Sequence, residues 1–237
     1  MLDFNFKKIT TIMKRILLLF SIILLTSCGN SKNSPEFIEA VSGNYLFNSD
    51  ESIGVTFIDE KLIIRWRGND NIEPLKVNDS TFYLQEMNEK FIFKMQPKVH
   101  IILAPKREHD GREYAFPKLA DGEKTPREYL LNKEYEKALL GYKAIQKKDS
   151  LDRTIRERTF NRLGYQMIRN NKIDEAIEIF KINIKMYPNS SNTYDSLADG
   201  YLEKKDTVNA ILYYKKALSI NPENRSSKRR LKKITQE

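Results

Sequence analysis

The chain has one cysteine and two histidines in 237 residues, and this scarcity excludes several kinds of site. A single cysteine cannot form a disulfide within the chain or build a cysteine-based zinc site. His100 and His109 cannot form a metal triad without carboxylates. The acids Glu108 and Asp110 flank His109 beside a glycine, a pattern that is typical of a hairpin turn. We therefore expect no metal and no cofactor, and stability must come from packed cores.

The sequence also lacks the motifs of common catalytic sites. No serine is followed by lysine three residues later, which excludes a Ser-x-x-Lys nucleophile. The Gly-x-Ser-x-Gly elbow and the Gly-x-x-x-x-Gly-Lys phosphate loop are missing as well. We interpret the adjacent acids Asp50-Glu51 and Asp59-Glu60 as turn residues and not as acid–base pairs. The sequence therefore predicts that the protein is not an enzyme.

The cysteine stands at the end of a short apolar segment. Residues 16–25 are apolar apart from one serine and follow Lys14 and Arg15, as in a secretory signal. The segment is shorter than the roughly 20 residues that a membrane-spanning helix needs. The ending Leu25-Thr-Ser-Cys28 resembles the lipobox of bacterial lipoproteins, in which the preceding peptide is removed and the cysteine is fatty-acylated. The alternative is an ordinary signal peptide followed by a free cysteine.

This resemblance implies a lipid-anchored protein of the cell envelope. Residues 1–27 would be the signal peptide, and the polar residues 28–35 would form a flexible tether. Gly29 departs from the aspartate that often follows the cysteine in lipoproteins retained at the inner membrane. We therefore expect the periplasmic face of the outer membrane. Either Met1 or Met13 could be the true start of translation.

Residues 36–118 are predicted to form a small antiparallel β domain. Apolar and polar residues alternate with period two, so that Leu62, Ile64 and Trp66 share one face of a strand. Short turns separate the runs, which indicates a meander of about eight strands. Such a meander must curl to bury one face, and we expect a barrel or a sandwich. Ser34-Pro35 predicts a short capped helix ahead of the strands.

Residues 119–237 repeat with a period of about 34 residues, which is the signature of tetratricopeptide helix pairs. The matching pairs are Phe160 and Tyr194, Leu163 and Leu197, Gly164 and Ala198, Ala176 and Ala210, Phe180 and Tyr214, and Pro188 and Pro222. We predict two full repeats after an irregular helix pair at 126–132 and 135–148, with a longer link at 149–151. A basic capping helix is expected at 225–234. The fold class is α+β, a small β domain followed by a helical solenoid.

Both halves resemble accessory regions of one hydrolase architecture. Gly43–Tyr45, Glu60–Leu62 and the Leu103–Phe116 hairpin are similar to the β domain at the C-terminal end of exported serine β-lactamase-like hydrolases. Glu175–Phe180 and Tyr187–Ser190 resemble the repeats in which many of those proteins end. The catalytic domain is missing here, so the resemblance implies an accessory role.

The first helix of each repeat is expected to line a peptide-binding groove. By resemblance to tetratricopeptide arrays, the groove positions are the second, fifth, ninth and twelfth or thirteenth of that helix. Counted from 157 and 191, they are Arg158, Asn161, Tyr165, Ile168 and Arg169, then Asn192, Asp195, Asp199, Leu202 and Glu203. The groove would change from cationic to anionic, which favours a peptide of mixed charge over a carboxylate clamp. The alternative is that these are merely solvated helix faces.

The end of the chain is basic, and its cations are Arg225, Lys228, Arg229, Arg230, Lys232 and Lys233. Such a run attracts anionic lipid or nucleic acid. Export argues against nucleic acid, so we expect no such partner and keep lipid contact as a hypothesis. The alternative is the solvated face of a final helix.

Two functions stay open at this point. The first is a membrane-anchored, non-catalytic module that binds an envelope protein or peptide through its repeats. The second is an accessory subunit of a separately encoded envelope hydrolase, or a β domain that holds a small ligand. Inward aromatic residues motivate the ligand version, although such residues more often fill a small barrel. They are Trp66, Phe82, Phe91 and Phe93.

Overall fold

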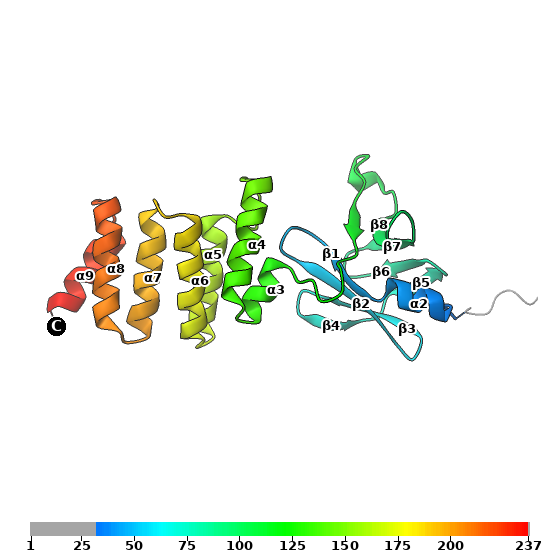
Figure 1. Cartoon of the computed structure of the whole chain (residues 1–237), viewed down its shortest axis with the longest axis horizontal. Helices are drawn as coiled ribbons and strands as arrows, with labels where there is room; N and C mark the ends of the chain where they lie inside the picture. The colour runs from blue at the N-terminus through cyan, green and yellow to red at the C-terminus, as the bar shows by residue number, and fades with distance from the viewer. Residues whose placement is uncertain (1–31, 237) are drawn as a thin grey trace, which may run out of the picture.

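The protein is an elongated chain of two halves, a β domain followed by a row of helices (Figure 1). The structure is a computed structural model and describes residues 32–236. The expected signal peptide, Cys28 and most of the expected tether lie outside the described residues. Within the described part, no helix combines the length and the apolar character needed to cross a membrane.

A short helix, α2 (Pro35–Val41), opens the described chain. Its N-cap is Ser34, whose hydroxyl accepts a hydrogen bond from the backbone N–H of Phe37 at 3.2 Å. Proline stands at the first helical position, where no backbone N–H is needed. The predicted capped helix is therefore confirmed, and its buried Val41 joins the core of the β domain.

The β domain consists of two antiparallel sheets. The first contains β1 (Gly43–Leu46), β2 (Ser52–Ile58), β3 (Lys61–Trp66) and β4 (Asn69–Ile72), in that order. The second contains β5 (Leu75–Asn78), β6 (Thr81–Leu84), β7 (Glu89–Lys94), β8 (His100–Leu103) and β9 (Ala115–Pro117). Within each sheet, every strand pairs with its sequence neighbours, as in a meander, and β4 and β5 belong to different sheets.

The two sheets do not close into a continuous barrel. On one side, an isolated bridge between Tyr45 of β1 and Lys118, just after β9, links the two sheets. On the other side the chain passes from β4 to β5 through Glu73 and Pro74. Proline has no N–H to donate, so the ladder is interrupted where the chain changes sheet. The sandwich alternative therefore describes this domain better than the barrel.

Aromatic side chains fill the space between the sheets. The ring of Phe93 meets the rings of Tyr45 and Phe82 edge to face, at centroid distances of 5.9 and 5.7 Å. Phe82, Phe91 and Phe93 are buried as the alternation predicted, whereas Trp66 is only half-buried. Edge-to-face packing of this kind adds about 0.5–1.5 kcal/mol per pair beyond the burial of area.

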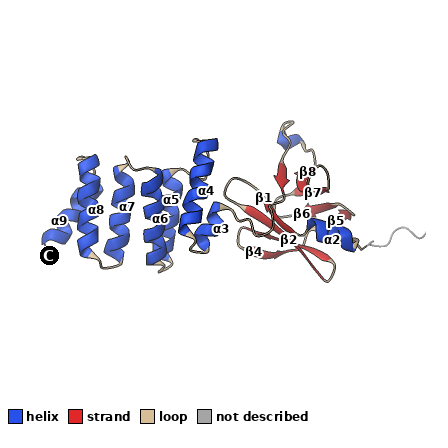
Figure 2. Cartoon of the chain, in the orientation of Figure 1, coloured by secondary structure: helices blue, strands red, loops and turns tan. Residues whose placement is uncertain are grey.

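The second half is wholly helical (Figure 2). It contains α3 (Pro126–Leu131), α4 (Tyr135–Lys148), α5 (Glu157–Arg169), α6 (Ile173–Met186), α7 (Ser191–Glu203), α8 (Thr207–Ile220) and α9 (Arg225–Gln236). The predicted helix pair ahead of the repeats is confirmed. The link between α4 and α5 covers residues 149–156, which is longer than predicted.

The repeat period has a packing cause. A Cβ atom added at Gly164 would lie 2.3 Å from Cε1 of Phe180, so these two helices approach more closely than any side chain at 164 allows. Phe180 also packs near Gly200 of the following repeat, where an added Cβ would meet its ring at 3.2 Å. The small residue at 164 lets the two helices approach, and the aromatic ring at 180 packs between consecutive repeats.

The capping helix α9 starts one period after α7, at Arg225. It therefore occupies the place of the first helix in a further repeat. Its Leu231 and Ile234 pack on a buried cluster with Ala198 and Tyr214. This position brings α9 beside α7, and that neighbourhood decides the chemistry of the expected groove.

Candidate functional site

The candidate site is the surface made by α5, α7 and α9, which we call the first-helix face. Side chains join each helix of this face to the next. The Asn192 amide of α7 donates to Glu157 of α5 at 2.7 Å. Tyr165 of α5 donates to Asp199 of α7 at 2.9 Å. The three helices therefore form one continuous layer.

The expected groove residues differ in how far they are exposed to solvent. Arg158, Arg169 and Asn192 are exposed, and so is Glu203. Four others are half-buried, namely Asn161, Tyr165, Ile168 and Leu202. Asp195 and Asp199 are buried, with only 6% and 7% of their surface exposed. The second half of the face is therefore not an open anionic surface, and this corrects the expected change of charge along the groove.

Asp199 is the centre of a polar network that joins three helices to α7. Its carboxylate accepts hydrogen bonds from the hydroxyls of Tyr165 and Tyr214. The Nε of Arg230, on α9, lies 3.0 Å from the same carboxylate. Burial raises the pKa of Tyr165 and that of Tyr214 above the ordinary tyrosine value, so both hydroxyls keep the proton that they donate. Asp199 is thus a structural residue of the repeat junction.

Helix α9 also covers the side chain of Asp195. The Ser227 hydroxyl of α9 donates to its carboxylate, and Ser227 is itself fully buried. Burial raises the pKa of Asp195 above the ordinary value, while the bond from Ser227 opposes that shift. The capping helix therefore engages both acids of α7, through a hydroxyl at Asp195 and through a cation at Asp199.

What stays open on the first-helix face is mostly cationic. Arg158 and Arg169 of α5 are exposed, as are Arg229 and Lys233 of α9. The exposed acid at an equivalent position is Glu203. Arg229 and Lys233 stand at the fifth and ninth positions of α9 counted from 225. The sequence indicated the position of these α9 cations, because extending the 34-residue period by one repeat places α9 on the first-helix face.

The basic end of the chain is only partly available to a partner. Arg230 is held by Asp199, and Lys228 lies 3.2 Å from Glu223. Arg229, Lys232 and Lys233 are exposed. The helix lies at the end of the molecule opposite to the point where the described chain begins (Figure 1).

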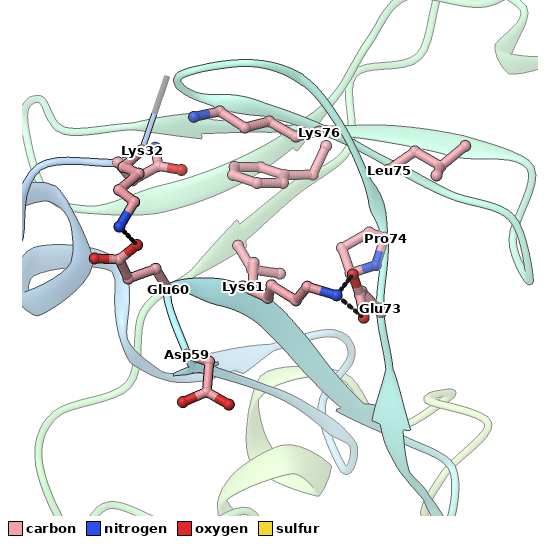
Figure 3. A pocket seen from close by; sticks show the side chains of 11 residues that line it. Lys32, Asp59, Glu60, Lys61, Glu73, Pro74, Leu75 and Lys76 are labelled. Atoms are coloured by element: carbon pink, nitrogen blue, oxygen red, sulfur yellow. Dashed lines mark hydrogen bonds and ion pairs between the residues drawn. The ribbon is translucent and has the colours of Figure 1, made fainter. Parts of the chain in front are cut away.

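A cavity of about 440 Å³ in the β domain is where the small-ligand alternative would apply (Figure 3). Leu62 and Phe82 contribute its apolar lining. At its rim Lys61 pairs with Glu73 at 2.9 Å, and Lys32 pairs with Glu60 at 2.6 Å. These rim charges satisfy one another, so no charged group of these two pairs is left for a ligand.

His109 is buried in the loop between β8 and β9, where it lies 3.0 Å from a carboxylate oxygen of Glu89. Lys106 reaches the same carboxylate at 3.4 Å. The flanking acids Glu108 and Asp110 are exposed, and Asp110 adopts a left-handed conformation. No cluster of three or more potential metal ligands occurs within residues 32–236.

Comparison with known proteins places the helical half. No family model matches the chain. A curated relative from Arabidopsis thaliana, the tetratricopeptide repeat domain-containing protein PYG7, chloroplastic, is 30% identical over 87 residues. The match covers 37% of this chain and 29% of the relative, so this chain spans a minor part of that protein's length.

Two solved structures are similar to the helical half. One is the first TPR of Spaghetti (RPAP3) bound to the HSP90 peptide SRMEEVD, with 16% identity and a TM-score of 0.33. The match covers 47% of this chain and 85% of that chain. The other is the Sgt2 TPR domain from Aspergillus fumigatus, with 17% identity, a TM-score of 0.33, and coverage of 47% and 72%. In its period and its paired helices, the helical half of this chain is similar to a tetratricopeptide repeat array, the repeat that its curated relative is named for.

Proposed function

We propose that the protein is a non-catalytic interaction module whose first-helix face binds an acidic segment of a partner protein. The observation that carries this proposal is the closure of Asp195 and Asp199 by α9. With those two carboxylates engaged inside the fold, the open charges are the cations of α5 and α9 together with Glu203 of α7. An acidic segment complements this face better than the mixed-charge peptide that the sequence alone suggested.

Binding on this face would be mainly electrostatic at its rim. Exposed cations attract an acidic partner over roughly 10 Å at moderate salt, and salt screens that attraction. The half-buried Tyr165 and Asn161 lie between the cations of α5 and supply contact area. The proposed partner is therefore an extended peptide with several carboxylates.

Charge reversal on the face tests the proposal. The variant Arg158→Glu, Arg169→Glu, Arg229→Glu changes three exposed side chains and leaves the Asp199 network intact. We expect its affinity for the acidic peptide SRMEEVD, measured by fluorescence anisotropy, to fall by at least about tenfold, which is about 1.4 kcal/mol. The affinity of the unmodified protein should also fall as salt is raised.

A matched control reverses three exposed lysines away from this face, Lys143, Lys147 and Lys215 of α4 and α8. It alters net charge by the same amount and should bind the peptide almost as well as the unmodified protein. An equal loss in the control would show a general effect of net charge. The proposal would also be contradicted if a peptide whose acidic residues are replaced by lysine bound as tightly as SRMEEVD itself.

We further propose that a lipid on Cys28 holds the protein in the cell envelope. The support is the Leu25-Thr-Ser-Cys28 sequence. The array extends away from the point where the described chain begins (Figure 1), which would keep the first-helix face clear of an anchoring membrane. We expect Cys28→Ser to abolish labelling by a fatty-acid analogue and to move the protein out of the membrane fraction. Unchanged labelling would refute the anchor.

A further inference from the structure

The β domain and the helical half meet through the loop between β1 and β2, residues 47–51, which we call the junction loop. The Ser49 hydroxyl donates to Asp152, in the link between α4 and α5, at 2.6 Å. Directly after the loop, Ser52 donates to Glu128 of α3 at 2.8 Å. A single loop therefore reaches two separate segments of the helical half.

The junction loop has its own internal order. The side-chain oxygen of Asn48 accepts hydrogen bonds from the backbone N–H groups of Asp50 and Glu51, both at 2.9 Å. The backbone N–H of Phe47 donates to the carbonyl of Glu51 at 2.9 Å. Asx turns of this kind hold a loop in one conformation. The loop therefore presents Asp50 to the helices in a defined orientation.

Asp50 is the residue that enters the contact, and it is 4% exposed. Asp50 lies in a turn, as the sequence analysis interpreted it, but its side chain is covered by the helical half. Tyr142 of α4 and Arg127 of α3 lie beside its carboxyl group and favour its ionised form. The Oδ1 atom has no hydrogen-bond partner and is shielded from solvent. An ionised carboxylate is costly in such a place, because its charge is neither hydrated nor fully paired.

The surrounding charges compensate for this cost only in part. Burial raises the pKa of Asp50 to about 7, and the positive charge of Arg127 is the main influence that opposes the rise. Glu51 of the same loop is held by Arg67 at 3.3 Å. Burial also raises the pKa of Tyr142, so this hydroxyl stays a donor. The other charged groups that line the adjacent cavity of about 480 Å³ are Arg65, Asp70 and Glu128.

We propose that the junction loop is a proton-dependent latch, which holds the β domain against α3 and α4 while Asp50 carries a proton and loosens when Asp50 ionises. A released Asp50 would ionise near its ordinary value of 3.8, whereas the docked group keeps its proton to about pH 7. Docking is therefore strongest below about pH 4, weakens as the pH rises towards 7, and stays constant above that. Over this range the ratio of docked to released forms falls on the order of a thousandfold.

The latch can be followed with an internal probe. Trp66 is the sole tryptophan of the chain, and it lines the same cavity as Asp50. We expect its fluorescence in the full chain to change between pH 5 and pH 8. As the pH rises over the same range, trypsin should cut more readily at Lys118 and Lys124, which lie in the connector between β9 and α3. In Asp50→Asn both changes should disappear, because the amide cannot ionise.

Two further variants separate the latch from other titrations. The signal assigned to the latch is the difference between the unmodified protein and Asp50→Asn. Glu51→Gln removes the neighbouring carboxylate and should leave the transition in place. Tyr142→Phe removes a donor to the ionised form and should move the midpoint to higher pH. A transition that persists in Asp50→Asn, a midpoint unmoved in Tyr142→Phe, or no pH response in the unmodified protein would overturn the proposal.

Discussion

Replacing Asp199 with alanine is expected to lower the free energy of unfolding of the helical half by about 3 kcal/mol or more. The substitution removes the acceptor for two tyrosine hydroxyls and the partner of Arg230. Tyr214 is fully buried, so its hydroxyl would lose its bond in a place that water does not reach. The loss should appear as a lower midpoint of urea unfolding, followed by far-UV circular dichroism.

Two comparisons make this prediction specific. Asp199→Asn keeps the shape and one acceptor oxygen, and it should lose less stability than the alanine variant. Glu203→Ala changes an exposed acid on the same helix and should stay within about 0.5 kcal/mol of the unmodified protein. If Asp199→Ala were as stable as Glu203→Ala, the network would contribute nothing measurable, and Asp199 would return to the list of candidate groove residues.

The second large effect is expected at Gly164, where alanine should cost about 1–3 kcal/mol. An added Cβ would lie 2.3 Å from Cε1 of Phe180, a side chain that is itself fully buried. The ring must move, and it has no free space to enter. The clash outweighs the gain of up to about 1 kcal/mol from replacing glycine within a helix. Thermal and urea unfolding would both register the loss.

The cause can be tested by making room for the new methyl group. Gly164→Ala combined with Phe180→Leu should lose less stability than the sum of the two single variants, since the smaller side chain relieves the clash. Gly200→Ala serves as the matched glycine control, because the same addition there meets Ile177 and Phe180 at a milder 3.2 Å. Additive losses in the double variant would contradict a steric origin.

The helical half was predictable because its signals are local and repeat. Gly164, Phe180 and Pro188 each recur one period later as Ala198, Tyr214 and Pro222. Each acts on residues close to it in the chain, because Gly164 packs against Phe180 and Pro188 follows the end of α6. Helix starts at 157 and 191 follow from the same period. For the same reason, the alternation along β2 and β3 was sufficient to predict these strands.

The candidate site was predictable only in outline. Arg158 and Arg169 of α5 are exposed, and their role in a peptide-binding groove stays a prediction. The charge of the α7 part of the first-helix face was not predictable, because it depends on which helix lies across from Asp195 and Asp199. Ser227 and Arg230 are about 30 residues away in sequence, and their side chains act only once α9 has docked.

By itself, the sequence determined the repeat period, the order of a β half and a helical half, and the short apolar segment that ends at the single cysteine. Each of these is written in neighbouring residues or in a fixed spacing. The tertiary structure decided that the sheets stay separate, that α9 closes the acids of α7, and that Asp50 is buried between the halves. The physical reason is that burial and charge pairing depend on neighbours in space, and a turn acid in the sequence gives no sign of the helix that will cover it.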